Sequence, residues 1–137
     1  VRRAMAVKVR IIEQDPFERG IRAALNLGHT IGHAVELVSG YAVRHGEAVA
    51  IGAVAEARLA EQIGLAEPGL ADEIAAVLHA VGLPTEIPAD LDREAILQAM
   101  QFDKKKSGGT VKFTLPAAIG DVRVGIEVKG LGDWGIL

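Results

Sequence analysis

Cysteine is absent from this 137-residue chain, so it can form neither a disulfide framework nor a thiolate metal site. Any metal ion would have to be held by histidine and carboxylate side chains. Apolar runs long enough to span a membrane are also missing. The first residues, VRRAMAVKVRIIEQD, carry charges where a signal peptide is apolar. No glycine-rich nucleotide fingerprint follows a strand, so any cofactor-binding domain is expected outside these residues.

What is present is typical of a globular protein. Half of the residues are apolar, and the formal net charge is only −3. A chain of this length can form one domain with one hydrophobic core. The weak charge gives no reason to expect nucleic acid or a membrane surface as a partner. We therefore expect a single cytoplasmic domain over residues 1–137.

The apolar periodicity predicts a mainly α fold, a helical bundle with a small C-terminal β-hairpin. Helices are predicted at about residues 1–13, 22–38 and 46–63, from Pro68 to a stop at Gly82 and Pro84, and at about 92–101 with Asp92 as its cap. The segment DKKKSGG (103–109) is predicted as a charged, flexible loop, followed by strands at 110–116 and about 121–128, with a turn at Ile119-Gly120. The helix at 46–63 is apolar nearly all round, which indicates the centre of the bundle.

Histidines are the most informative residues. In the predicted helix 22–38, one polar stripe contains Arg22, Asn26, His29 and His33. A solvated helix face usually carries Lys and Glu, which form helices better than Asn and His do. Gly28 and Gly32 run beside the stripe, and glycine allows another backbone or a ligand to approach closely. This departure from a good helix sequence indicates a functional site.

The spacing of the histidines suggests a metal site. His29 and His33 lie four residues apart, as in HExxH helices, although the glutamate of that signature is missing. His45, at a helix start, could fold back toward the same face. Glu36 and Glu47 are the carboxylates that could orient a ligating imidazole.

Cationic and amide groups that could meet an anionic substrate accompany these histidines. They are Lys8, Arg22, Asn26 and the run Lys104, Lys105 and Lys106. Arginine holds carboxylate or phosphate in a bidentate manner, and lysine supplies a point charge.

Three strings together resemble the C-terminal domain of 3-dehydroquinate synthases: R-x-x-L-N-L-G-H-T-x-G-H-A-x-E, H-G-E-A-V-A-I-G, and D-K-K before a strand. The resemblance runs from Lys8 through Gly120. It implies that His29 and His45 bind zinc or cobalt, with a third ligand, a glutamate, from the part of the family chain upstream of Val1.

The same resemblance assigns the substrate contacts. His33 and Asn26 would contact substrate rather than metal, which replaces the simple interpretation of His29 and His33 as a ligand pair. Arg22 and Lys8 would hold anionic and polar groups of the substrate. One lysine of the D-K-K segment, Lys104 or Lys105, would reach it too; because another lysine follows, the register leaves both open.

The reaction implied by the resemblance converts 3-deoxy-D-arabino-heptulosonate 7-phosphate to 3-dehydroquinate and phosphate in aromatic amino acid biosynthesis. NAD oxidises C5, phosphate leaves by elimination, C5 is reduced again, and an aldol step closes the ring. NAD would be bound mainly by an N-terminal nucleotide-binding domain that these residues do not include. We expect no turnover from residues 1–137 alone, and a homodimer for the full-length enzyme.

Three alternatives remain open. Another sugar-phosphate cyclase, such as a 2-deoxy-scyllo-inosose synthase, shares the metal and NAD chemistry but has a substrate without the carboxylate that Arg22 would hold. A polyol or iron-type alcohol dehydrogenase also uses spaced histidines in a helical domain. The third alternative is a non-catalytic metal-binding module.

Overall fold

The structure, a computed structural model, describes residues 26–106 and 111–128, and of residues 102–106 it describes only the backbone. The elements in these ranges are α2 (His29–Val38), α3 (His45–Gln62), α4 (Leu70–Ala80), α5 (Arg93–Lys106), β1 (Lys112–Ala118) and β2 (Asp121–Glu127). The predicted mainly α fold with a C-terminal hairpin is confirmed. The helix predicted at 1–13 lies outside the described residues. No described helix has the length and apolar character needed to cross a bilayer.

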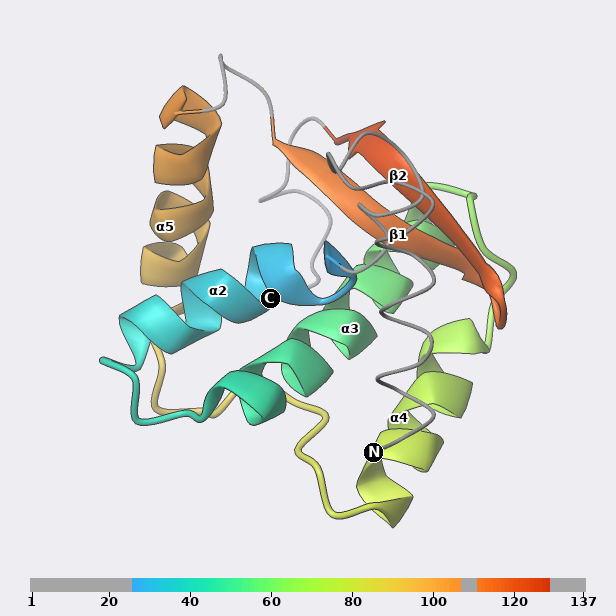
Figure 1. Cartoon of the computed structure of the whole chain (residues 1–137), viewed down its shortest axis with the longest axis horizontal. Coiled ribbons are helices and arrows are strands. Elements are labelled where there is room, and N and C mark those ends of the chain that lie inside the picture. Colours follow the sequence, from blue (N-terminus) through green and yellow to red (C-terminus); the bar gives the residue numbers. More distant parts are fainter. Residues whose placement is uncertain (1–25, 107–110, 129–137) are drawn as a thin grey trace, which may run out of the picture.

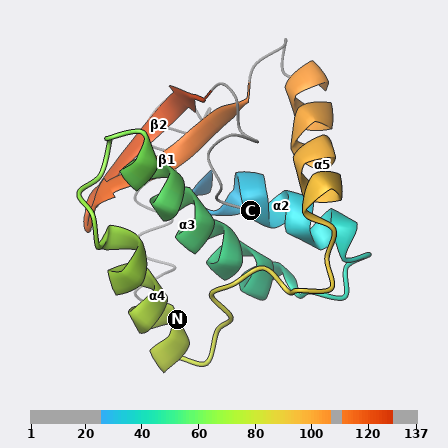
Figure 2. The ribbon, with the colours of Figure 1, turned by 180° about the vertical axis from the view of Figure 1, so that it is seen from behind.

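Helix α3 occupies the centre of the molecule, as its apolar sequence predicted. Helices α2 and α4 and strand β1 all contact it, and α5 packs against α2 (Figure 1). The view from behind shows α3 running between α2 and α4, with the hairpin at one end (Figure 2). The largest fully buried apolar side chains come from four of these elements: Ile31, Val35, Ile51, Val54, Leu59, Ile96, Met100, Phe113 and Leu115.

Three helices end in the same way. The residue after each C-cap is a glycine with positive φ: Gly40, Gly64 and Gly82. In each case the next N–H donates to a carbonyl five residues back, as Leu65 does to Ala60. This is the Schellman arrangement, in which glycine adopts the left-handed conformation without strain. The predicted helix ends at about residues 38 and 63, and the stop at Gly82, are therefore confirmed.

Two predicted boundaries were wrong. The histidine helix does not run unbroken from residue 22, because Gly28 has a φ of 81° and α2 begins at His29. A left-handed residue cannot continue a right-handed helix, so Asn26 does not belong to the face that carries His29 and His33. The segment 103–106 is not loop but the last turn of α5, since Asp and Lys are compatible with a helix. Asp92 does cap this helix, accepting the N–H of Glu94 at 3.0 Å.

The hairpin closes the other side of the core. Strands β1 and β2 pair antiparallel, with irregular register between Phe113 and Leu115 and again between Pro116 and Ala118. Phe113 and Leu115 are buried against the helices, whereas every residue of β2 is exposed or half-buried. Gly120 supplies the left-handed residue of the connecting turn, where the sequence predicted it.

Helices α2 and α3 approach each other at backbone distance. A Cβ placed on Gly52 would lie 2.0 Å from the carbonyl oxygen of Gly28 and 2.7 Å from the amide nitrogen of Gly32. A Cβ on Gly32 would in turn lie 2.8 Å from the carbonyl oxygen of Ala48. The glycines beside the histidines thus admit another backbone, one of the two possibilities that the sequence raised. This contact fixes how the first turn of α2 lies against α3.

Candidate metal centre

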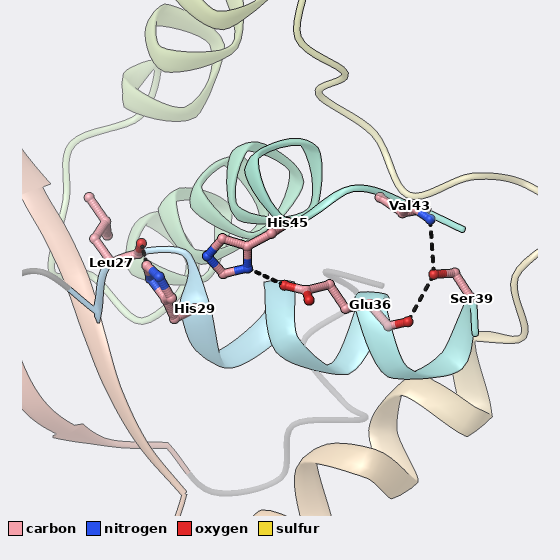
Figure 3. A network of polar contacts seen from close by, with 6 residues as sticks. All are labelled: Leu27, His29, Glu36, Ser39, Val43 and His45. Carbon is pink, nitrogen blue, oxygen red and sulfur yellow. Dashed lines mark hydrogen bonds and ion pairs between the residues drawn. The ribbon is translucent and has the colours of Figure 1, made fainter. Parts of the chain in front are cut away.

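His29 and His45 face each other across the interface of α2 and α3. Each is the first residue of its helix. Their ring centroids lie 5.4 Å apart, with the ring planes inclined at 57°. Figure 3 shows the ring of His45 between the carboxylate of Glu36 and the ring of His29. These two imidazoles, 16 residues apart in sequence, are neighbours because α2 and α3 pack antiparallel and the two side chains extend toward each other.

Hydrogen bonds determine which nitrogen of each ring carries the proton. Nδ1 of His29 lies 3.2 Å from the carbonyl oxygen of Leu27, which can only accept, so the ring donates from Nδ1. Nδ1 of His45 lies 2.5 Å from Oε1 of Glu36 and donates to that carboxylate. In the tautomer that these hydrogen bonds favour, the lone pair of each ring is on Nε2. This is the usual arrangement of metal-ligating histidines, whose other nitrogen donates to a carbonyl or a carboxylate.

The donor set of these two residues fits a divalent metal ion such as zinc. With Zn–N bonds of about 2 Å and tetrahedral angles, two imidazoles sharing an ion would have centroids about 5 Å apart. The spacing between His29 and His45 matches this. Among the described residues no group of three metal-binding side chains occurs. Two of the four positions of a tetrahedral site would therefore have to be filled by ligands other than these two imidazoles.

Glu36 makes hydrogen bonds through both its side chain and its backbone carbonyl. Its side chain is only 11% exposed, whereas that of His45 is 59% exposed, so the carboxylate is the fixed partner. Its backbone carbonyl accepts a 2.9 Å hydrogen bond from the hydroxyl of Ser39, and this hydroxyl accepts the N–H of Val43 at 3.2 Å (Figure 3). The predicted orienting role is thus supported by geometry for Glu36. Glu47 is half-buried two residues after His45 and makes no such contact with either ring among the described residues.

The structure describes only some of the other predicted site residues. His33 is exposed one turn beyond His29 and lies outside the paired rings. Asn26 is exposed in the turn before α2. The remaining predicted residues are not described in the structure: Lys8 and Arg22 lie outside the described residues, and the side chains of Lys104 and Lys105 do too, although their backbone belongs to α5.

One buried residue near the histidines was missed by sequence reasoning. Glu56 on α3 is fully buried, and its carboxylate accepts the N–H groups of Gly28 at 2.5 Å and Ile31 at 3.4 Å. Burial raises the pKa of Glu56 to about 8, although the hydrogen bonds from the backbone of residues 28, 31 and 30 lower it in part. A signal was available, since a glutamate inside a helix that is apolar all round has no solvated face to occupy.

Most of this chain matches a known protein family. The family model described as 3-dehydroquinate synthase C-terminal matches residues 1–106, which is most of the chain. The chain belongs to the 3-dehydroquinate synthase family. The resemblance found in the sequence motifs is thereby confirmed, and the paired histidines of α2 and α3 lie within the matched region.

Curated 3-dehydroquinate synthases are similar over nearly the whole chain. The enzyme of Synechococcus sp. is 47% identical over 127 residues, which is 92% of this chain and 34% of the relative. That of Nostoc punctiforme is 46% identical over 92% of this chain and 35% of its own length. That of Thermodesulfovibrio yellowstonii is 37% identical over 95% of this chain and 36% of its own length. The chain thus spans about a third of the 3-dehydroquinate synthases it matches.

Solved structures with the same fold are sugar-phosphate cyclases. A 2-deoxy-scyllo-inosose synthase complexed with carbaglucose-6-phosphate, NAD+ and Co2+ gives a TM-score of 0.83 at 22% identity, covering 96% of this chain and 38% of that one. A 2-epi-5-epi-valiolone synthase from Streptomyces hygroscopicus with NAD+ and Zn2+ bound gives 0.77 at 22% identity, over 97% of this chain and 36% of that one. These likenesses show the fold of the described helices and hairpin.

Proposed function

We propose that this chain is the metal- and substrate-binding part of an enzyme that converts 3-deoxy-D-arabino-heptulosonate 7-phosphate to 3-dehydroquinate and phosphate. The observation that carries the proposal is the pair His29 and His45, with both Nδ1 atoms engaged and both Nε2 atoms available. Family membership supports the choice of reaction, because the curated relatives carry that activity in their names. An NAD-binding domain would complete the active site.

The metal, when bound, would act as a Lewis acid on a substrate oxygen, and NAD would supply the redox step. The residues of this chain would hold the metal ion and orient the substrate. His29 and His45 would provide two imidazole ligands, and Glu36 would keep the ring of His45 in the Nδ1–H tautomer. His33 and Asn26, which are both exposed and lie within four residues of His29 in sequence, would donate to or accept from hydroxyl groups of the substrate. Positioning several groups around one substrate is a large source of rate enhancement.

Lys8, Arg22 and one of Lys104 and Lys105 are proposed to hold the anionic groups of the substrate. This rests on their match to the family motif. Arginine suits a carboxylate because its guanidinium binds both oxygens. We keep the cytoplasmic location, the homodimer and the inactivity of this chain by itself as predictions of the same resemblance.

The nearest alternative is another sugar-phosphate cyclase. The solved structures of such cyclases share the fold at 22% identity, which does not decide the substrate. The 3-dehydroquinate synthases at 46–47% identity favour the carboxylate-bearing substrate. No observation on the described residues favours an alcohol dehydrogenase or a module without catalysis.

A chimera tests the proposed function directly. The C-terminal third of the Synechococcus sp. enzyme would be replaced by this chain, because the two align over 92% of it. We expect the chimera to release phosphate from the heptulosonate phosphate and not from glucose 6-phosphate. The same chimera with His29→Ala should be inactive. A folded, NAD-binding chimera that processes only glucose 6-phosphate, or neither compound, would contradict the proposal.

A further inference from the structure

Glu56 lies at the place where α3 meets the start of α2. It is fully buried, near the middle of α3, and two turns of that helix separate it from Ala48 and Val49. One carboxylate oxygen accepts the N–H of Gly28, and the other accepts the N–H of Ile31. The N–H of Thr30 also interacts with it. The contacted amides thus lie on both sides of His29 in the chain.

These amides would otherwise lack partners. The first N–H groups of a helix have no acceptor within the helix, and a side chain at the N-cap usually provides one. Here the N-cap residue is Gly28, which has no side chain, and no side-chain cap hydrogen bond forms. Glu56 supplies the acceptor from another helix. Its negative charge, when present, would also interact favourably with the positive end of the α2 dipole.

The neighbouring glycine contact leaves little room for α2 to shift. Gly52 precedes Glu56 by one turn on the same face of α3, and its Cα lies against the carbonyl of Gly28. The backbone before His29 therefore packs against Gly52 and donates a hydrogen bond to Glu56. His29 itself remains half-buried, with its ring turned toward His45.

A buried carboxyl group is an expensive way to cap a helix. Moving it out of water is unfavourable unless hydrogen bonds compensate. A serine or aspartate at the N-cap position would accept the same N–H groups without being buried. Buried polar groups are retained in several proteins because they specify one arrangement among several packings. The two helices that Glu56 joins are the two that carry the paired imidazoles.

We propose that Glu56 is a positioning residue, which fixes the orientation of His29 relative to His45 by holding the backbone of residues 28–31. This inference rests on the proposed function, since it takes the paired imidazoles as the metal-binding pair. Without the Glu56 carboxylate, the first turn of α2 is free to fray. The ring of His29 then loses its fixed place although α2 and α3 stay packed.

The test compares Glu56→Ala and Glu56→Gln with Leu59→Ala in the 137-residue chain. Leu59 is fully buried on the same helix, and its side chain has no group that could accept the N–H groups of residues 28–31, so its truncation is a control for lost stability alone. Glutamine keeps the size of the side chain and one acceptor oxygen, but its amide nitrogen cannot accept an N–H group. All variants would be studied where circular dichroism shows them folded.

The first measurement is Zn²⁺ affinity, from titration against a competing chelator. We expect Glu56→Ala to weaken binding about 10-fold or more, as loss of an outer-sphere partner does. Glu56→Gln should lose less, and Leu59→Ala should bind as the unchanged chain does. Equal affinities in Glu56→Ala and Leu59→Ala would overturn the proposal.

The second measurement needs no metal. Nuclear Overhauser contacts between the rings of His29 and His45 should be present in the unchanged chain and in Leu59→Ala, and lost in Glu56→Ala. Contacts that persist in folded Glu56→Ala would also overturn the positioning role. The variant His29→Ala distinguishes failure of the proposed metal site from failure of the proposed role of Glu56. If His29→Ala binds Zn²⁺ as tightly as the unchanged chain, the metal site is wrong. The ring contacts in the Glu56 variants still test the positioning role.

Discussion

Glu36 on α2 and His45 on α3 are joined by a hydrogen bond in which Nδ1 of the imidazole donates to Oε1 of the carboxylate over 2.5 Å. The carboxylate is almost buried, and the imidazole is largely exposed. The buried partner therefore holds the exposed one in place. This bond orients the free Nε2 of His45, which the proposed metal would require.

Removing the Glu36 carboxylate should weaken metal binding without unfolding the chain. We expect Glu36→Ala to reduce Zn²⁺ affinity by about 10–100-fold, because partners that orient a ligating histidine contribute that much. Glu36→Gln should lose less, since its amide oxygen can still accept from Nδ1. Calorimetric titration checks this, with Glu47→Ala as the control that removes a nearby charge but leaves the imidazole bond. Equal losses in Glu36→Ala and Glu47→Ala would contradict the assigned role.

The three histidines of this region should respond differently to substitution. His29→Ala and His45→Ala should each lower Zn²⁺ affinity by about 100-fold or more, because each removes one coordinating nitrogen. His33→Ala should change it by less than about 2-fold, since an exposed ring outside the pair adds no ligand. Metal content after dialysis against a weak chelator gives the readout. Strong loss in His33→Ala would restore the interpretation of residues 29 and 33 as the ligand pair.

The stability of the chain should fall as the pH rises from 5 to 8 because of Glu56. Burial raises the pKa of this carboxyl group in the folded chain from 4.5 to about 8. Between these values the folded state holds a proton that the unfolded state has lost. The contribution is thus fully present below pH 4.5 and is lost as the pH rises through the folded pKa, at about 1.4 kcal/mol per unit.

Urea denaturation at a series of pH values measures this dependence. Glu56→Gln carries no titrating group at this position, so its free energy of unfolding should vary less over the same range. The difference between the two curves isolates Glu56 from other titrating residues. Parallel curves would show that burial of Glu56 does not shift its protonation on folding.

The glycine contact between α2 and α3 predicts opposite effects for two similar substitutions in α3. Gly52→Ala would place a methyl group 2.0 Å from the carbonyl oxygen of Gly28, so the helices must separate. We expect a loss of about 3 kcal/mol or more in the free energy of unfolding, because backbone cannot move aside as a side chain does. Gly46→Ala meets nothing within 4 Å and should stabilise α3 by up to about 1 kcal/mol.

Chemical denaturation of both variants provides the comparison. Zn²⁺ affinity adds a second readout, since Gly52→Ala should also displace His29 from His45 in whatever fraction remains folded. If Gly52→Ala has a free energy of unfolding close to that of the unchanged chain, the backbones of α2 and α3 do not approach each other closely at Gly52.

Sequence patterns predicted the parts of the fold that depend on local chemistry. Helix α3 was placed to within one residue at each end, because its apolar positions and Gly64 define it. The start of α2 was misplaced, since the pattern of polar residues continues through Gly28 although the backbone does not. The end of α5 was misplaced because a lysine run fits both a helix and a loop.

The candidate site was predictable only in part. His29 and His45 were recognised through family motifs, and Glu36 through its position beside them. Glu56 lay outside any motif, and the apolar helix around it indicated its burial but not which groups it would contact. Its partners are backbone amides more than 20 residues away, and periodicity within one helix carries no information about such contacts.

The connection between α2 and α3 has a consequence for how this region assembles. Only residues 39–44 separate the helices, and the chain reverses there through Gly40 and Tyr41, which have φ angles of 64° and 65°. Closing so short a loop carries little entropic penalty, and local contacts form early in folding. We therefore expect α2 and α3 to pack as one antiparallel pair, which brings the two rings together, before the β strands near the other end of the described chain pair.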